Sequence, residues 1–130
     1  MKEEVIKTLL EKSQTKQQVY DHTKAAFKKV KQILQDIVSD YNQDLMDADK
    51  RVLLEYRDRG VFESEIRIAG DLLIFNMHSN VFEFPPAHQI WKTKGGREDA
   101  LNTYAGIVNI YNFLADSFKY NRSDDLGYLI

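Results

Sequence analysis

Apolar positions in the first half of the chain recur every three or four residues. From Lys2 to Arg59 there is neither Gly nor Pro, so nothing in this stretch interrupts a helix. The spacing is helical and far from the two-residue repeat of a strand. The apolar stripe comprises Val19, Thr23, Ala26, Val30, Ile33, Ile37, Tyr41, Leu45, Ala48, Val52 and Tyr56.

The helix predicted from this stripe ends at Gly60. Two arginines precede this glycine, and a Gly after basic residues is typical of a helix C-terminus. A helix from Gln17 to Arg59 would be about 64 Å long at 1.5 Å per residue. A compact domain of this chain length has a radius of gyration of only about 14 Å. The helix therefore either folds back near residues 41–49, or it projects and packs against another chain.

The charges along the predicted helix favour contact with a second copy. Lysines within residues 24–31 precede aspartates within residues 36–49, and three of these aspartates stand four residues apart on one face. In two helices packed antiparallel and crossing near Ile33–Leu34, each basic segment would lie against the partner's acidic segment. The alternative is a solvated face with weak repulsion. The predicted homo-oligomer interface consists of Val19, Ala26, Val30, Ile33, Ile37 and Tyr41.

Past the predicted helix the period changes to that of β-strands. Residues 62–68 alternate imperfectly, residues 69–71 form a turn signal, and residues 72–77 are largely apolar. These two runs predict a β-hairpin. A third short strand is predicted at residues 81–84, where Pro85-Pro86 stops it.

The segment 98–119 fits either a helix or a strand, and its periodicity favours the helix. Its apolar residues repeat at intervals of three and four between Leu101 and Phe118, which favours a helix. Residues 107–113 are rich in strand formers, and Gly106 weakens a helix, which favours a strand. Both alternatives give an α+β fold: a long N-terminal amphipathic helix, kinked or folded back if not straight, then a small, mainly antiparallel sheet with a further C-terminal helix or strand.

Composition fits a single globular folding unit. The chain has 130 residues, 43% of them hydrophobic and 29% charged, which is too apolar for a disordered chain. Within this unit, residues 1–59 form the long helical segment, the expected oligomerisation element, and residues 60–130 form the α+β head.

Charge and cysteine content exclude several classes of function. A net charge of −2 gives no overall electrostatic reason for binding nucleic acid or membranes. The absence of Cys excludes disulfides, thiol nucleophiles and Cys-ligated zinc. The longest apolar run, residues 72–75, is too short to span a membrane, and the N-terminus lacks an apolar signal segment. We expect a cytoplasmic protein with no cofactor, no bound metal and no membrane partner.

The chain carries no established catalytic motif. It has no glycine-rich phosphate loop, no HExxH and no GxSxG. The densest group of functional side chains lies in residues 76–94, with two His, the only Trp and two Lys, residue types that titrate, stack on rings and attract anions. The alternative is that the Trp and the Phe residues are core and that both His are satisfied surface or turn residues. The predicted site for a small anionic or aromatic ligand comprises His78, Asn80, His88, Trp91, Lys92, Lys94 and Arg122.

These observations favour a non-enzymatic binding or assembly module that is homo-oligomeric through the long helix, with a small-ligand or protein-partner site on the head. One alternative is a small hydrolase of a phosphorylated or nucleotide substrate, with His78 or His88 as acid or base and the cations of the predicted site on the anion. A second alternative, nucleic-acid binding, rests only on the basic segment 24–31.

Overall fold

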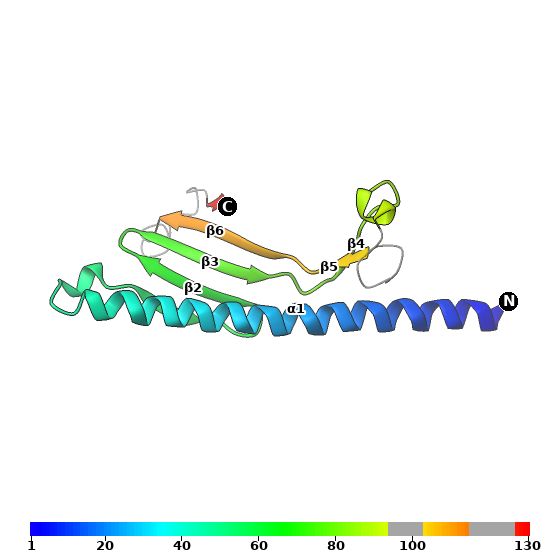
Figure 1. The fold of residues 1–130 in the computed structure, drawn as a ribbon, viewed down its shortest axis with the longest axis horizontal. Helices are drawn as coiled ribbons and strands as arrows, with labels where there is room; N and C mark the ends of the chain where they lie inside the picture. Colours follow the sequence, from blue (N-terminus) through cyan, green and yellow to red (C-terminus); the bar gives the residue numbers. More distant parts are fainter. Residues whose placement is uncertain (94–102, 115–126) are drawn as a thin grey trace. The chain divides into compact units, whose positions relative to one another are not determined.

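The α+β class predicted from the sequence is confirmed. The computed structural model describes residues 1–93, 103–114 and 127–130, and within them one long helix precedes a set of antiparallel strands (Figure 1). The elements are α1 (Lys2–Asp44), the 3-10 helix η1 (Lys50–Val52), β1 (Glu55–Asp58), β2 (Glu63–Ile68), β3 (Asp71–Met77), β4 (Phe82–Glu83), the 3-10 helix η2 (Gln89–Lys92), β5 (Tyr104–Ala105), β6 (Val108–Leu114) and β7 (Tyr128–Leu129).

The strands form a five-stranded sheet in the order β1-β2-β3-β6-β7 and a separate pair, β4-β5. The predicted hairpin is confirmed as β2 and β3, which pair antiparallel from Glu63↔Asn76 to Ile68↔Asp71. The turn between them holds Ala69 at a φ of 51°, in the left-handed region. The third predicted strand is confirmed as β4, and it pairs with β5 rather than with the hairpin.

The helix ends at Asp44, so the prediction that it continues to Arg59 was wrong. Of the two alternatives weighed for its length, the chain takes the fold-back. The returning chain is tied to the helix by Asn42, whose Nδ2 donates to the Leu54 carbonyl (2.8 Å) while its Oδ1 accepts from the Leu54 N–H (2.9 Å). One side chain thereby satisfies both backbone groups of a residue just before β1.

β1 replaces the last turns of the predicted helix because its residues alternate. Tyr56 is half-buried and pairs with Ile66, whereas its neighbours Glu55 and Arg57 are exposed. This period of two is that of a half-buried strand. Gly60 is therefore no helix cap: it lies between β1 and β2 at a φ of 114°, a conformation that favours glycine.

The helix favoured for residues 98–119 was wrong over residues 108–114, which form β6. This strand pairs with β3 along its whole length, from Met77↔Val108 to Asp71↔Leu114. An unpaired edge of β3 offers a hydrogen-bond ladder that local periodicity does not register, and β-branched residues fit it well. The remainder of this segment that precedes residue 103 or follows residue 114 lies outside the described residues.

The chain forms two compact units. The first unit comprises Met1–Ala25 and His78–Ile107, and the second unit comprises Ala26–Met77 and Val108–Ile130. The helical segment expected at residues 1–59 thus contributes to both. The first unit contains β4, β5 and η2, and the second contains the five-stranded sheet. Among the residues that the structure describes, no helix has the length and apolarity needed to cross a membrane.

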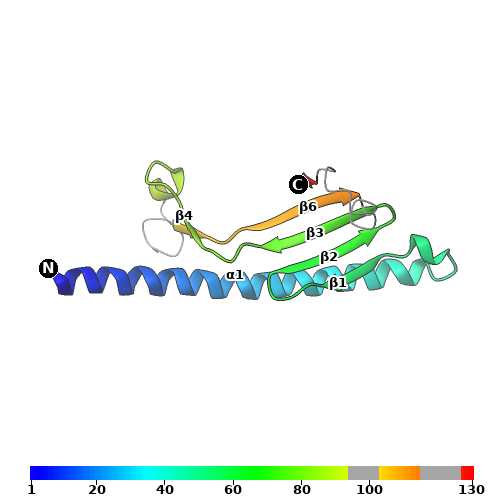
Figure 2. The ribbon, with the colours of Figure 1, turned by 180° about the vertical axis from the view of Figure 1, so that it is seen from behind.

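In the second unit the core lies between α1 and the sheet. Figures 1 and 2 show α1 running beside β1 and β2, with β3 and β6 lying progressively farther from it. Each large apolar side chain buried in such a core contributes about 1.5–3 kcal/mol to folding. The buried apolar residues of this core are Phe27, Leu34, Val38, Ile66, Phe75 and Met77, whereas Leu72, which pairs with Arg67, is buried on the opposite face of the sheet.

Candidate functional site

In the second unit α1 carries two apolar stripes, and the sheet covers only one of them. Phe27, Leu34 and Val38 are buried, whereas 56% of Ile33 and 40% of Ile37 are exposed. At about 100° per residue, the exposed residues lie roughly 100° around the helix axis from the buried ones. The sheet therefore uses a different face of the helix from the stripe that the sequence singled out.

The residues predicted as an oligomer interface mostly lie on the exposed stripe. Val19 is the exception, because it is buried within the first unit and belongs to the core of that unit. The remaining five all keep accessible surface, with Val30 half-buried. We call them the outer stripe: Ala26, Val30, Ile33, Ile37 and Tyr41.

Hydrogen bonds to the returning chain show which way the outer stripe faces. Lys31 Nζ donates to Asp58 Oδ1 (2.9 Å) and to the Gly60 carbonyl, and Asn42 bonds to Leu54, so both side chains point toward β1. They lie about 40–60° around the helix from the buried stripe, in the sense opposite to the outer stripe. The outer stripe therefore lies on the side of α1 away from β1, the side toward β3 and β6.

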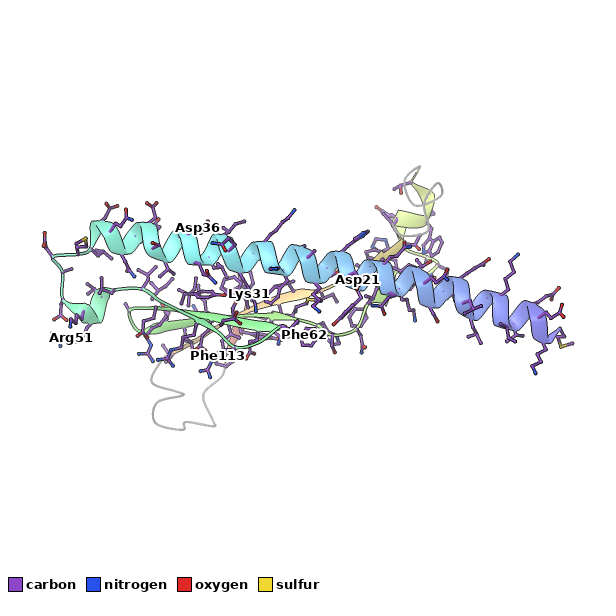
Figure 3. All side chains as sticks on the ribbon, turned by 90° about the horizontal axis from the view of Figure 1, so that it is seen from below. Asp21, Lys31, Asp36, Arg51, Phe62 and Phe113 are labelled. Carbon is purple, nitrogen blue, oxygen red and sulfur yellow. The ribbon has the colours of Figure 1, made fainter. Side chains whose placement is uncertain are left out.

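One lysine of the predicted basic segment forms an ion pair within the chain. Lys31 is only 11% exposed in its ion pair with Asp58, and Figure 3 shows it directed toward the sheet while Asp36 points away. The ammonium group, together with the N–H of Gly60, lowers the pKa of the Asp58 carboxyl from its ordinary value. Lys31 is therefore unavailable to a partner helix or to nucleic acid, and the exposed cations of this segment are Lys24, Lys28 and Lys29.

The two histidines of the predicted ligand site each hold a local turn. His78 Nδ1 accepts from the Asn80 N–H (3.1 Å), and His88 Nδ1 accepts from the Ile90 N–H (3.1 Å) as the N-cap of η2. These are the bonds expected of residues that stabilise turns. The alternative interpretation from the sequence, in which the histidines are satisfied in turns, therefore holds for the Nδ1 atom of each ring.

Trp91 and both histidines also pack against the phenylalanines of the β4 region. The indole N–H of Trp91 donates to the Phe84 carbonyl (3.0 Å), and the His88 ring lies 4.5 Å from the Phe84 ring. The His78 ring contacts Phe82 instead, edge-on at 4.9 Å. The two histidine rings therefore contact different phenylalanines.

A hollow of about 680 Å³ opens on the first unit beside α1. Of the predicted site residues it includes Asn80 alone. Lys92 is exposed in η2 and does not line it, and Lys94 and Arg122 lie outside the described residues. The hollow offers one cation, amide and hydroxyl groups, and two aromatic rings. Its lining residues are Ser13, Lys16, Gln17, Tyr20, Ser79, Asn80, Val81 and Phe82.

Two other groups of ionisable residues are engaged within the fold. On β1 and β2, Glu55 forms ion pairs with Arg57 (3.8 Å) and Arg67 (3.9 Å), and Arg59 pairs with Glu65 (3.1 Å). These ion pairs engage three arginines and two glutamates, so most of the charge in this group is matched within the sheet. In the part of the chain described by the structure, no three His, Asp or Glu side chains come together as metal ligands.

Beside β4, burial raises the pKa of the Tyr104 hydroxyl, and the nearby charge of Glu83 raises it further. Tyr104 pairs with Glu83 across the β4-β5 ladder and is buried. Its hydroxyl therefore stays protonated at neutral pH and can donate a hydrogen bond, but it does not serve as a base.

The geometry thus offers two exposed features, the outer stripe in the second unit and the hollow in the first. The sequence anticipated most of the outer stripe and, of the hollow, only Asn80. No protein family, curated protein or solved structure matches the chain, so its own residues carry the functional interpretation.

Proposed function

We propose that this protein is a non-enzymatic binding and assembly module that associates with further copies of itself through the outer stripe of α1. One observation carries the proposal: the sheet buries Phe27, Leu34 and Val38 and leaves Ile33 and Ile37 exposed on the same helix. Single exposed apolar residues are common, but a contiguous row of them on one helix marks a contact surface.

The size of the outer stripe indicates that more of the surface takes part. A standard stable interface uses about 20–30 residues a side, whereas the outer stripe has five. The acidic residues Asp36 and Asp40 line the same shallow hollow as Ile33 and Ile37, which gives the stripe a polar rim on its far side. An apolar centre with a polar rim is the usual anatomy of a protein interface.

The test is the mass of the protein in solution. At tens of micromolar, sedimentation equilibrium is expected to give a multiple of 15.2 kDa. Ile37→Asp should yield a monomer that keeps its helical circular dichroism, because pairing would bury an unpaired carboxylate. The matched control is Gln35→Asp, which adds the same charge at an exposed position of α1 outside the outer stripe and should leave the mass unchanged. A wild-type mass of one chain would refute the proposal.

A second candidate function, binding of a small anionic or aromatic ligand, is favoured by the hollow in the first unit. Lys16 supplies a cation, and Tyr20 and Phe82 supply rings for stacking. Nucleoside monophosphates are suitable probes because they carry both features. Ligand-observed NMR should detect binding that Lys16→Gln abolishes and that Lys12→Gln, a change outside the hollow, preserves. Release of inorganic phosphate from the same compounds would favour the hydrolase alternative instead.

A further inference from the structure

One wall of the hollow in the first unit follows directly on His78. Half of the residues that line this hollow are 79–82, the four that come immediately after His78 in the chain. We call residues 79–82 the loop wall. Both of its ends are anchored: the His78 N–H donates to the Ile107 carbonyl (2.8 Å), and Phe82 pairs with Ala105. The shape of the loop wall therefore depends on what holds the residues between these two anchors.

The His78 side chain holds that intervening segment. Its Nδ1 accepts from the Asn80 N–H (3.1 Å), and among the described residues this is the only hydrogen bond made by residues 79–81. The His78 ring also lies 4.9 Å from the Phe82 ring. Asn80 and Phe82 both line the hollow, so one side chain contacts the loop wall at two points.

The bond to Asn80 exists only while the His78 ring is neutral. Nδ1 accepts a hydrogen bond through its lone pair, whereas in an imidazolium both ring nitrogens carry a proton and can only donate. Histidine side chains take up a proton between about pH 5 and 8. Protonation of His78 would set one N–H against another, and the loop wall would lose the bond that fixes it.

Other ionisable groups lie on the elements that form the hollow or pair with its loop wall. α1 contributes Lys16 and Tyr20 to the lining, and Glu83 pairs with Tyr104 across the β4-β5 ladder. Of the residue types lysine, tyrosine, glutamate and histidine, only histidine changes its charge between about pH 5 and 8. His78 is therefore the group among these five whose charge changes near neutral pH.

We propose that His78 is a positioning residue of the hollow and makes ligand binding there depend on pH, an inference that rests on the ligand site proposed above. Neutral His78 holds the loop wall in the shape that presents Asn80 and Phe82 to the hollow, and protonated His78 releases it. An anionic aromatic ligand therefore binds less tightly as the pH falls. A direct effect of charge has the opposite sign, because an imidazolium near Lys16 would add to the attraction for an anion.

The test uses naphthalene-1-sulfonate, a probe with a flat ring and an anion whose charge is constant over this pH range. Loss of binding in Lys16→Gln places the probe in the hollow. In ligand-observed NMR titrations the wild-type affinity should fall by about three- to tenfold between about pH 7.5 and about pH 5.5, the effect of losing one hydrogen bond. His78→Asn supplies an amide oxygen that accepts from the Asn80 N–H at either pH, as in an Asx turn. This variant should therefore bind the probe equally at both pH values.

The matched control is His88→Asn. His88 makes the same kind of bond to the Ile90 N–H but neither lines the hollow nor precedes the loop wall, so this variant should keep the wild-type pH dependence. A second readout needs no ligand. In the free protein, protection of the Asn80 amide against hydrogen exchange, corrected for the intrinsic rate at each pH, should fall at acid pH in the wild type and persist in His78→Asn.

The outcomes separate this inference from the proposed ligand site. Binding that tightens at acid pH, a pH dependence that survives in His78→Asn, or Asn80 protection that does not change with pH would each overturn the inference. If the probe binds with the same affinity at both pH values, the ligand site stands and the inference fails. If the probe does not bind at about pH 7.5, the ligand site fails, and the protection of the Asn80 amide still decides whether neutral His78 holds the loop wall.

Discussion

Gly106 lies closer to α1 than any residue with a side chain could. A Cβ added there would be 2.2 Å from Thr23 Oγ1 and 2.3 Å from Thr23 Cγ2, well inside van der Waals contact. The φ of Gly106 lies outside the left-handed region, so alanine would meet no backbone strain. Gly106 and Thr23 belong to the same unit, and Gly106→Ala therefore tests how tightly the segment 78–107 packs on the helix.

The expected loss follows from which atoms must move. Thr23 is β-branched and stiff on a helix, and its Cβ itself would lie 2.7 Å from the added atom, so a rotamer change cannot relieve the contact. Overpacking of this kind costs about 1–3 kcal/mol. Thr23→Ala removes the two nearest atoms, Oγ1 and Cγ2, but keeps the Cβ, and it also removes one hydrogen bond to the Val19 carbonyl (2.7 Å), a back-bond that adds little to helix stability. The double variant should therefore recover part of the loss.

Urea unfolding followed by Trp91 fluorescence measures the effect in the unit concerned, because the indole N–H is bonded to the Phe84 carbonyl of that unit. The midpoint for Gly106→Ala should fall by about 1 M, given a slope of about 1–3 kcal/mol per molar urea. Gly70→Ala is the matched control, since nothing lies within 4 Å of its added Cβ. A midpoint unchanged by Gly106→Ala, or a loss that Thr23→Ala does not reduce, would refute the close approach.

Three further predictions concern the second unit. Ser64→Ala should leave the free energy of unfolding unchanged or raise it by about 1 kcal/mol, because the buried Oγ has no hydrogen-bond partner among the described residues; chemical denaturation measures this, and a loss above 1 kcal/mol would contradict it. Asn42→Asp should lower the free energy of unfolding by about 1–3 kcal/mol in the same assay, because it removes the donor to Leu54 and sets a carboxylate against the carbonyl. Asp58 has a lowered pKa in the folded state, so its ion pair with Lys31 stabilises the fold above about pH 4, and this stabilisation is lost as the pH falls below that value. In a profile of unfolding free energy against pH, Lys31→Met should therefore flatten the fall at acid pH. An unaltered fall would assign it to other groups.

Much of the fold could be predicted because local pattern and tertiary structure agree there. The hairpin at residues 62–77 combines a period of two with a glycine turn, and Pro85-Pro86 follows β4. The end of α1 could not be placed, because Leu45 and Tyr56 continue the helical spacing while Tyr56 also alternates with charged neighbours. The helix or strand choice at residues 108–114 was decided by the free edge of β3, which is absent from the local sequence.

The candidate surfaces, too, could be predicted from the sequence only in part. The apolar spacing revealed the outer stripe, but it did not show that Phe27, Leu34 and Val38, spaced seven and four residues apart, form a second stripe that the sheet prefers. The hollow in the first unit brings Lys16 beside Asn80, 64 residues away in sequence. Lys16 lies in a polar stretch of helix and has no local feature that marks it, so only the fold connects the two.

The two apolar stripes on α1 also make folding and assembly distinguishable by experiment. Side chains such as Phe27 are buried in the single chain, so their contribution to stability does not depend on protein concentration. In the proposed self-association Ile33 and Ile37 would gain burial when copies meet, so their contribution would grow with concentration by mass action. Replacing a residue of the buried stripe should therefore lower stability equally in dilute and concentrated samples. Replacing a residue of the outer stripe should lower it only where the wild-type protein is assembled, and that contrast assigns each stripe its role.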